Sequence, residues 1–288
     1  MTLRHAPEGA TQGEPVSVQG SRQARPPRGV ASLYAGNSRA VVGRGLRATR
    51  STNWVVVLTG FVEPIFYLLS LGVGLGAYIG AVQDADGHQI PYAAYIAPAL
   101  LAVSAMNGAI YDSTWNVFFK MNFGKLYEGM LATSLGPLDV ALGEISLALL
   151  RGAAYGLGFL TVMQFAGLNL SWTAILALPA LLVIAFGFAS LGMGITSYMK
   201  TFQQMDWIQF VLLPMFLLSA TFYPISVYPV PVQWVVQALP LWHGVELIRG
   251  LTTGVIGPAM LVHLLYYLVM IVVGLTFTTR RLRALFLD

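Results

Sequence analysis

The amino-acid sequence predicts an all-α membrane protein with six transmembrane helices. Of its 288 residues, 56% are hydrophobic and only 10% are charged, whereas about a quarter of the residues in soluble domains are charged. The mean hydropathy is +0.69. Several charge-free stretches exceed the roughly 20 residues that a helix needs to cross a bilayer. This composition excludes an aqueous enzyme, since so few charges could not cover a soluble surface.

The gaps between charged residues place the six spans. The charge-free interval between Arg151 and Lys200 is too long for one helix, and turn-forming residues at Gly167, Asn169 and Ser171 divide it in two. Glu63 is the one charge inside the first span. The predicted spans are residues 54–79, 91–111, 137–165, 172–196, 207–222 and 257–278.

The remaining segments flank or interrupt this bundle. Residues 1–32 are rich in Pro, Gly, Gln and Arg and predict a disordered cytoplasmic tail. Arginines at helical spacing over 33–53 favour an amphipathic interfacial helix, with a solvated basic linker as the alternative. The transmembrane domain would then occupy 54–283. Between the last two spans, prolines interrupt an apolar stretch, which predicts two short re-entrant helices at 231–238 and 240–249.

The orientation follows from the basic residues. Lysines and arginines gather before the first span, between the second and third, between the fourth and fifth, and after the sixth. Because cytoplasmic loops carry the excess of positive charge, both termini are predicted to lie in the cytoplasm, with the chain in the plasma (cell inner) membrane.

The sequence offers little sign of a cofactor, nucleotide or metal site on this chain. There is no cysteine, and Gly72-Val73-Gly74-Leu75-Gly76 lacks the third glycine of a dinucleotide-binding fingerprint. His243 and Glu246 fall short of the three protein ligands that a metal needs, and His263 is expected to join no cluster. We therefore expect no cofactor or metal on this chain, and Glu246 paired with Arg249.

Ionisable residues inside a span are costly and are functional candidates by default. Glu63 precedes a proline in the first span, and Glu144 and Arg151 share one face of the third, where they are expected to partly neutralise each other. Asp139 lies at the start of that span, where a helix N-terminus favours an anion. A proton relay is the competing interpretation.

One stretch resembles a known family. Leu218-Ser219-Ala220-Thr221-Phe222-Tyr223-Pro224, followed by Trp234 and by residues 239–250 (LPLWHGVELIRG), is similar to the signature region of ABC-2 type transporter permeases. The closest branch is that of the lipooligosaccharide (nodulation-factor type) exporters, related to the anthracycline exporters. Residues 63–72 (EPIFYLLSLG) and 95–98 (YIAP) resemble it too.

The resemblance implies a half-transporter whose ATP and Mg are held by a separate ATP-binding subunit, with a second permease subunit, identical or related, beside it. It also implies three sets of site residues. The coupling helix to the ATPase would comprise Leu126, Tyr127, Glu128, Gly129, Met130 and Leu131. The translocation path would include Asn107, Phe216, Ser219, Thr221 and Phe222, and the outer gate Trp234, Trp242, His243 and Glu246.

The resulting hypothesis is ATP-driven export of an amphipathic lipid-linked, glycolipid-like or drug molecule, with no enzyme activity and no nucleic acid involved. The alternative is a secondary transporter or channel driven by an ion gradient, for which Glu63 would be the key residue. A membrane enzyme acting on lipid carriers is disfavoured, because Asp84, Asp86 and His88 form a turn without an acid–base partner.

Overall fold

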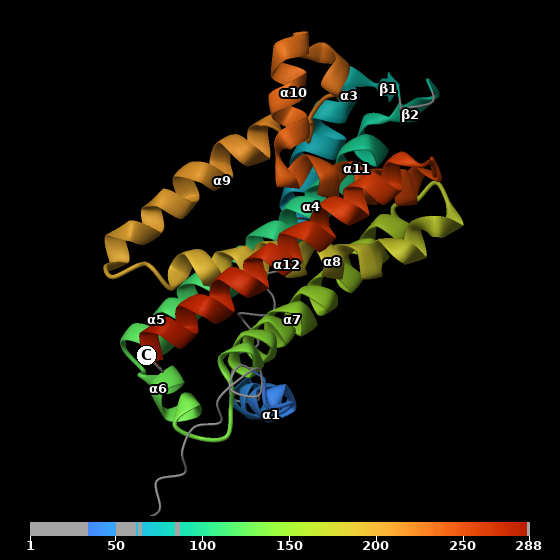
Figure 1. Ribbon diagram of the computed structural model, residues 1–288. Coiled ribbons are helices and arrows are strands. Elements are labelled where there is room, and N and C mark those ends of the chain that lie inside the picture. Colours follow the sequence, from blue (N-terminus) through green and yellow to red (C-terminus); the bar gives the residue numbers. More distant parts are fainter. Residues whose placement is uncertain (1–33, 50–61, 63–64, 84–86, 287–288) are drawn as a thin grey trace, which may run out of the picture.

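The structure is a computed structural model that describes residues 34–49, 62, 65–83 and 87–286. Within these ranges the chain is almost entirely helical, and the elements follow in an order close to that predicted (Figure 1). The first part of the chain contributes α1 (Ser38–Thr49), a helix over Ile65–Ile79 that includes η2 (Leu68–Leu75) and α3 (Gly76–Ile79), β1 (Ala81–Gln83), β2 (Gln89–Pro91), α4 (Tyr92–Tyr111), η3 (Asp112–Asn116), α5 (Val117–Asn122), α6 (Leu126–Leu131) and α7 (Pro137–Phe165).

The second part begins with η4. Before it, α7 ends at Phe165 and the chain turns at Gly167, which has a left-handed backbone with φ +69°. This second part comprises η4 (Trp172–Leu176), α8 (Ala177–Thr196), η5 (Phe202–Met205), α9 (Asp206–Leu218), η6 (Ile225–Val227), α10 (Val230–Ala238), α11 (Pro240–Thr253) and α12 (Ala259–Phe286).

Four helical segments of the described chain are long and apolar enough to cross a membrane: Tyr92–Asn122, Pro137–Phe165, Trp172–Thr196 and Ala259–Phe286. The third and fourth predicted spans have the same bounds as two of these segments. The second and sixth are longer than expected, because α4 continues through η3 into α5 and because α12 continues past the arginines near its end. The predicted first span lies partly outside the described residues, which begin again at Ile65.

The helix at the predicted fifth span is shorter than expected. It was expected to continue to residue 222, but α9 ends at Leu218. Ala220 has φ +52°, a left-handed conformation that a non-glycine residue rarely adopts and that a continuing α-helix excludes. A short antiparallel hairpin of β1 and β2, pairing Val82 with Ile90, was not predicted.

α8 forms the centre of the bundle, in contact with α4, α7, α11 and α12. A close fit around Tyr267 of α12 shows how the helices pack. This side chain is fully buried, and a Cβ added to Gly187 of α8 or to Gly244 of α11 would lie 2.7 Å or 2.6 Å from its atoms. Small residues thus let two helices, α8 and α11, approach the Tyr267 side chain of α12, as is typical of membrane helix packing.

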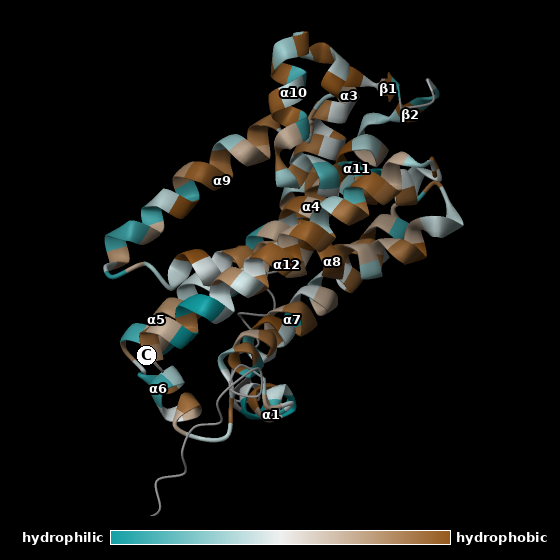
Figure 2. Ribbon diagram, in the orientation of Figure 1, coloured by the Kyte–Doolittle hydropathy of each residue, from teal (hydrophilic) through white to brown (hydrophobic). Residues whose placement is uncertain are grey.

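The surface pattern suits a lipid environment. On α12, Leu261, Leu265 and Leu268 are each more than half exposed. Figure 2 shows hydrophobic colouring along the middle of α8 and α12 and hydrophilic colouring toward the C-terminal end of α12. At that same end of the bundle, α1 packs on α7 through Val41, which is buried against Gly143. A helix therefore forms over Ser38–Thr49, inside the predicted 33–53, and its place at the membrane interface stays a prediction.

Candidate functional site

The sequence-predicted site residues fall at opposite ends of the bundle (Figure 1). α10 and α11, which carry the predicted gate, lie at one end together with the β1–β2 hairpin. α6, which carries the predicted coupling helix, lies at the other end with α5 and α1. We refer to these as the α10–α11 end and the α6 end.

Arg249 is the centre of the α10–α11 end. Although charged, it is only 6% exposed, and its guanidinium satisfies several partners at once. Nη1 donates to Glu246 Oε1 at 2.6 Å, Nη2 donates to the Ala220 carbonyl at 3.0 Å, and the guanidinium carbon lies 3.9 Å from the centre of the Tyr95 ring. The predicted Glu246–Arg249 pair is confirmed. Its role is broader than expected, since Arg249 ties α11 to α4 and to the break after α9.

The break after α9 gathers two of the predicted path residues. Ser219 and Thr221 are fully buried, and their hydroxyls donate to the carbonyls of Met215 and Phe216 at 2.5 Å and 3.0 Å. These bonds satisfy carbonyl groups that the end of α9 leaves unpaired. Within this chain, both hydroxyls thus serve the backbone.

The other path candidates lie on different elements. Asn107 is exposed on α4. Phe216 and Phe222 are half-buried and meet edge to face, with ring centres 5.1 Å apart, and Phe216 also faces Tyr67 at 6.4 Å. The structure thus brings Phe216, Ser219, Thr221 and Phe222 together and leaves Asn107 apart from them on α4. That these residues line a path stays a prediction.

The predicted gate residues have unlike surroundings. Trp234 on α10 is 69% exposed, whereas His243 on α11 is buried and Trp242 is half-buried. Burial is the main cause that lowers the pKa of His243 to about 4, and the neighbouring His263 adds to it. A contact that was not predicted joins His243 to His263, whose Nδ1 atoms lie 2.8 Å apart. Twenty residues separate the two in sequence, so local spacing gave no signal.

At the α6 end, the predicted coupling helix forms with the expected bounds, Leu126–Leu131. It has two faces. Tyr127, Met130 and Leu131 are buried and Leu126 is half-buried, while Glu128 and Gly129 are exposed. The hydroxyl of Tyr127 is fully enclosed and has no hydrogen-bond partner among the described residues, and burial raises its pKa well above the usual range. The helix is therefore anchored through one face and open on the other.

Glu144 of α7 is held near α6 by two cations. Its side chain is 5% exposed, and its carboxylate oxygens lie 2.5 Å from Lys120 Nζ of α5 and 3.4 Å from Arg44 of α1. The predicted pairing of Glu144 with Arg151 was wrong. The two residues are seven apart on one helix, but packing against α1 and α5 offers Glu144 nearer cations.

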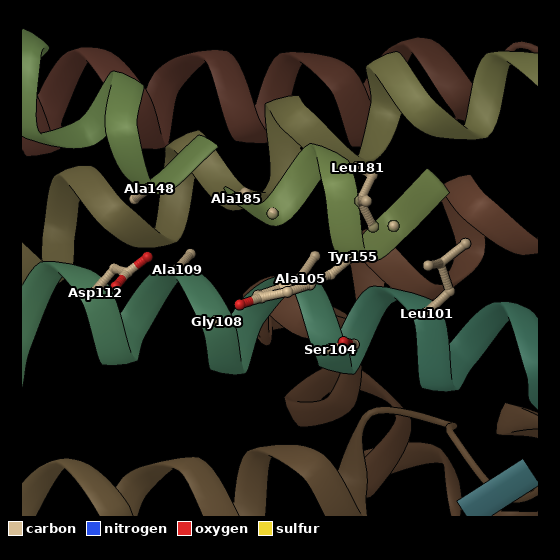
Figure 3. A pocket seen from close by; sticks show the side chains of 12 residues that line it. Leu101, Ser104, Ala105, Gly108, Ala109, Asp112, Ala148, Tyr155, Leu181 and Ala185 are labelled. Atoms are coloured by element: carbon tan, nitrogen blue, oxygen red, sulfur yellow. The ribbon is translucent and has the colours of Figure 1, made fainter. Parts of the chain in front are cut away.

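Arg151 instead pairs with Asp112 of η3 at 3.0 Å. Asp112 lines one end of a pocket between α4, α7 and α8. The pocket has a volume of about 370 Å³ and is partly open to solvent. Figure 3 shows the labelled residues of α4, from Leu101 to Ala109, and Asp112 of η3 along one side of it. The other lining residues are mostly small, so the pocket is a narrow, largely apolar crevice with its charge at one end.

Asp139 behaves as predicted for an anion at a helix start. Its carboxylate accepts from the backbone N–H of Gly136 at 2.9 Å, closing the first turn of α7. It also accepts from the N–H groups of Ala35 and Asn37 at 2.7 Å and 2.9 Å, which fixes the chain just before α1. One side chain thus orders the starts of two helices.

The remaining predictions concern Glu63 and a bound metal ion. Glu63 lies outside the described residues. Over the part of the chain that the structure describes, no group of three or more His, Cys, Asp or Glu side chains is arranged to hold a metal ion.

Comparison with known proteins places these features in a wider context. Residues 38–253, from the first residue of α1 to the last of α11, match the model of the family described as ABC-2 type transporter. The chain is 34% identical over 230 residues to nodulation protein J of Rhizobium leguminosarum bv. viciae, covering 78% of this chain and 86% of that protein. It is also 34% identical to nodulation protein J of Sinorhizobium fredii (73% and 79% covered) and of Bradyrhizobium diazoefficiens (77% and 84% covered).

Proposed function

Because the chain belongs to the ABC-2 type transporter family, and is therefore an integral membrane transport protein, we propose that it is the permease subunit of an ATP-driven exporter. Its cargo would be an amphipathic molecule, either lipid-linked, glycolipid-like or a drug, taken from the cytoplasm or the inner leaflet. The likeness to several nodulation J proteins, over most of their length, favours this branch of the family.

The two-faced helix α6 carries the proposal. Tyr127, Met130 and Leu131 anchor it in the bundle, and Glu128 and Gly129 are left exposed at the end of the molecule farthest from α10 and α11. A short, firmly anchored helix of this kind can act as a rigid lever between a soluble subunit and a helix bundle. In this proposal the separate subunit binds ATP and Mg, so this chain is not itself an enzyme.

The proposed topology has six spans, with both termini in the cytoplasm and the chain in the cell inner membrane. The helix over Ile65–Ile79 would end the first span and α9 would form most of the fifth. A second permease subunit, either a copy or a relative, would complete the path beside Asn107, Phe216 and Phe222. α10 and α11, with Trp234 and Trp242, would form the outer gate.

The test begins with purification. The isolated chain is expected to hydrolyse no ATP, and a separately encoded ATPase is expected to copurify with it from a gentle detergent extract. If the reconstituted chain instead moved an amphipathic dye by itself in response to an ion gradient, the proposal would be wrong and the secondary-transporter alternative would stand.

A substitution on α6 tests the lever. Glu128→Arg is expected to reduce the amount of copurified ATPase, since it reverses a charge on the exposed face. Glu128→Gln is the matched control, because it removes the negative charge without introducing a positive one. Leu131→Arg is less informative because Leu131 is only 8% exposed, so a charge there would also disturb folding. Undiminished copurification and ATPase activity with Glu128→Arg would contradict the assignment of α6.

A further inference from the structure

Three side chains from the start of α12 contact the corner between α10 and α11 or the first turn of α11 that follows it. Tyr266 donates its hydroxyl to the Ala238 carbonyl at 3.0 Å, and Tyr267 donates to the Pro240 carbonyl at 2.8 Å. The third contact joins the rings of His263 and His243, whose Nδ1 atoms lie 2.8 Å apart. We call this corner, Ala238–Pro240, the α10–α11 corner.

The histidine contact is enclosed on all sides. His243 and His263 are 6% and 7% exposed. The ring of His243 stacks on Tyr266 with centres 4.0 Å apart, and the Trp242 ring meets both imidazoles edge to face at 4.9 Å and 5.2 Å. The pair therefore contributes directly to the packing of α11 against α12.

This contact depends on protonation. Two Nδ1 atoms at hydrogen-bond distance need one N–H and one lone pair, which two neutral imidazoles of opposite tautomer provide. One added proton leaves the bond possible but buries a charge. Two added protons point two N–H groups at each other and bring two positive charges together, so the contact cannot persist.

Two neighbouring groups oppose that repulsion without removing it. The Gln237 backbone is hydrogen-bonded to His243, which favours its charged form, and Glu246 of α11 acts on His263 although its carboxylate is already paired with Arg249. The other ionisable groups on α4 and α12 are Tyr92, Tyr95 and Tyr111, Tyr266 and Tyr267, and the arginines near the C-terminal end of α12. α8 and α10, which also pack there, carry no ionisable side chain.

The geometry points to a proton-operated latch, in which the neutral His243–His263 pair holds the α10–α11 corner against α12 and acid releases it. The inference does not depend on ATP or on the cargo, so it can fail while the proposed function stands.

The direction of the effect follows from linkage. The pKa of His243 is lowered from 6.5 to about 4, so an opened or unfolded form binds a proton that the closed form does not. The latch is therefore fully effective above about pH 6.5 and weakens as the pH falls toward about 4. For each proton taken up on opening, the ratio of open to closed molecules changes by up to about tenfold per pH unit.

A pair of spin labels measures this directly, since the chain has no cysteine of its own. Val235→Cys on α10 and Leu261→Cys on α12 place labels on side chains that are 58% and 70% exposed. We expect one distance between the labels at pH 8 and a second, longer population that grows between about pH 6.5 and 4, with unchanged helix content by circular dichroism.

The decisive comparison is the double variant His243→Asn/His263→Asn, whose amides can hydrogen-bond but do not titrate. It is expected to show the same distance distribution at every pH. Should it fold poorly, His263→Asn alone serves: the burial of His243 remains but the second charge is gone, so the longer population should be smaller than in the wild type at the same pH. His88→Asn, at an exposed histidine before β2, is the control that should keep the transition. A wild type without the longer population, or an equal transition in the Asn variants, would overturn the latch.

Discussion

At the α10–α11 end, a single arginine is almost completely enclosed and contacts three separate segments of the chain. At the α6 end, a buried glutamate meets cations that remain partly in water. The side chain of Arg249 is 8% exposed, whereas Lys120 and Arg44, the partners of Glu144, are 30% and 43% exposed. Glu246, the partner of Arg249, is itself 27% exposed, so Arg249 is set apart by its own burial and by its added contacts to the Ala220 carbonyl and the Tyr95 ring. Water and salt reach both cations that hold Glu144 and screen those pairs.

Because of this difference, we expect the α10–α11 end to be rigid, a fixed end, and the α6 end to be able to move. Arg249 joins α4, α11 and the break after α9 through buried bonds to the Tyr95 and Ala220 carbonyls. Glu144 joins α1, α5 and α7 through bonds that solvent can replace. We expect movement to enter at the α6 end, and the α10–α11 end to hold its shape until its own contacts are released.

The largest effect is expected for Arg249→Leu. It removes the partner of the Glu246 carboxylate and leaves the buried Ala220 carbonyl only the Tyr95 hydroxyl at 3.5 Å, and losing the partner of a charged group costs more than the about 1–3 kcal/mol of a neutral one. Thermal unfolding in detergent, followed by tryptophan fluorescence, measures it. Arg249→Lys keeps the charge but loses the fork that reaches both partners, so its loss should be intermediate. An unfolding midpoint equal to that of the wild type would refute the idea of a fixed end.

A smaller effect is expected for Tyr267→Phe. Removing this hydroxyl leaves the Pro240 carbonyl without its donor next to a fully buried ring, at a cost of about 1–3 kcal/mol. The neighbouring Tyr266→Phe is the matched control, because Tyr266 is only half-buried and its bond to Ala238 is exposed. Equal losses for the two variants would show that burial does not set the strength of these contacts.

The smallest effect is expected for Glu144→Gln, which keeps the shape and removes the charge. Since both cations are partly exposed, we expect a loss of about 1 kcal/mol or less. The difference from wild type should shrink as salt is raised, because salt screens exposed charges. The Arg249→Leu defect should be nearly insensitive to salt. If salt moved both variants alike, the proposed contrast between the two ends would disappear.

The positions of the helices followed from local properties. Crossing a bilayer needs a certain length of apolar residues, and charges, glycines and prolines interrupt it, so the bounds of α7 and of η4 with α8 were predicted closely, while those of α6 came from the family resemblance. The shorter α9 was not, because its end depends on Ala220, whose left-handed backbone is held by Arg249 from another helix. The β1–β2 hairpin was missed for a different reason: so short a pairing leaves only a weak strand pattern in the sequence.

What the sequence by itself determined is which segments are helical and apolar, and which family the chain resembles. The tertiary structure alone decided which charges and rings meet. Glu144 lies seven residues from Arg151 yet pairs with Lys120 and Arg44, and His243 finds His263 on another helix. Apolar length is a property of one segment, whereas the partner of a buried polar group depends on how several helices pack around it.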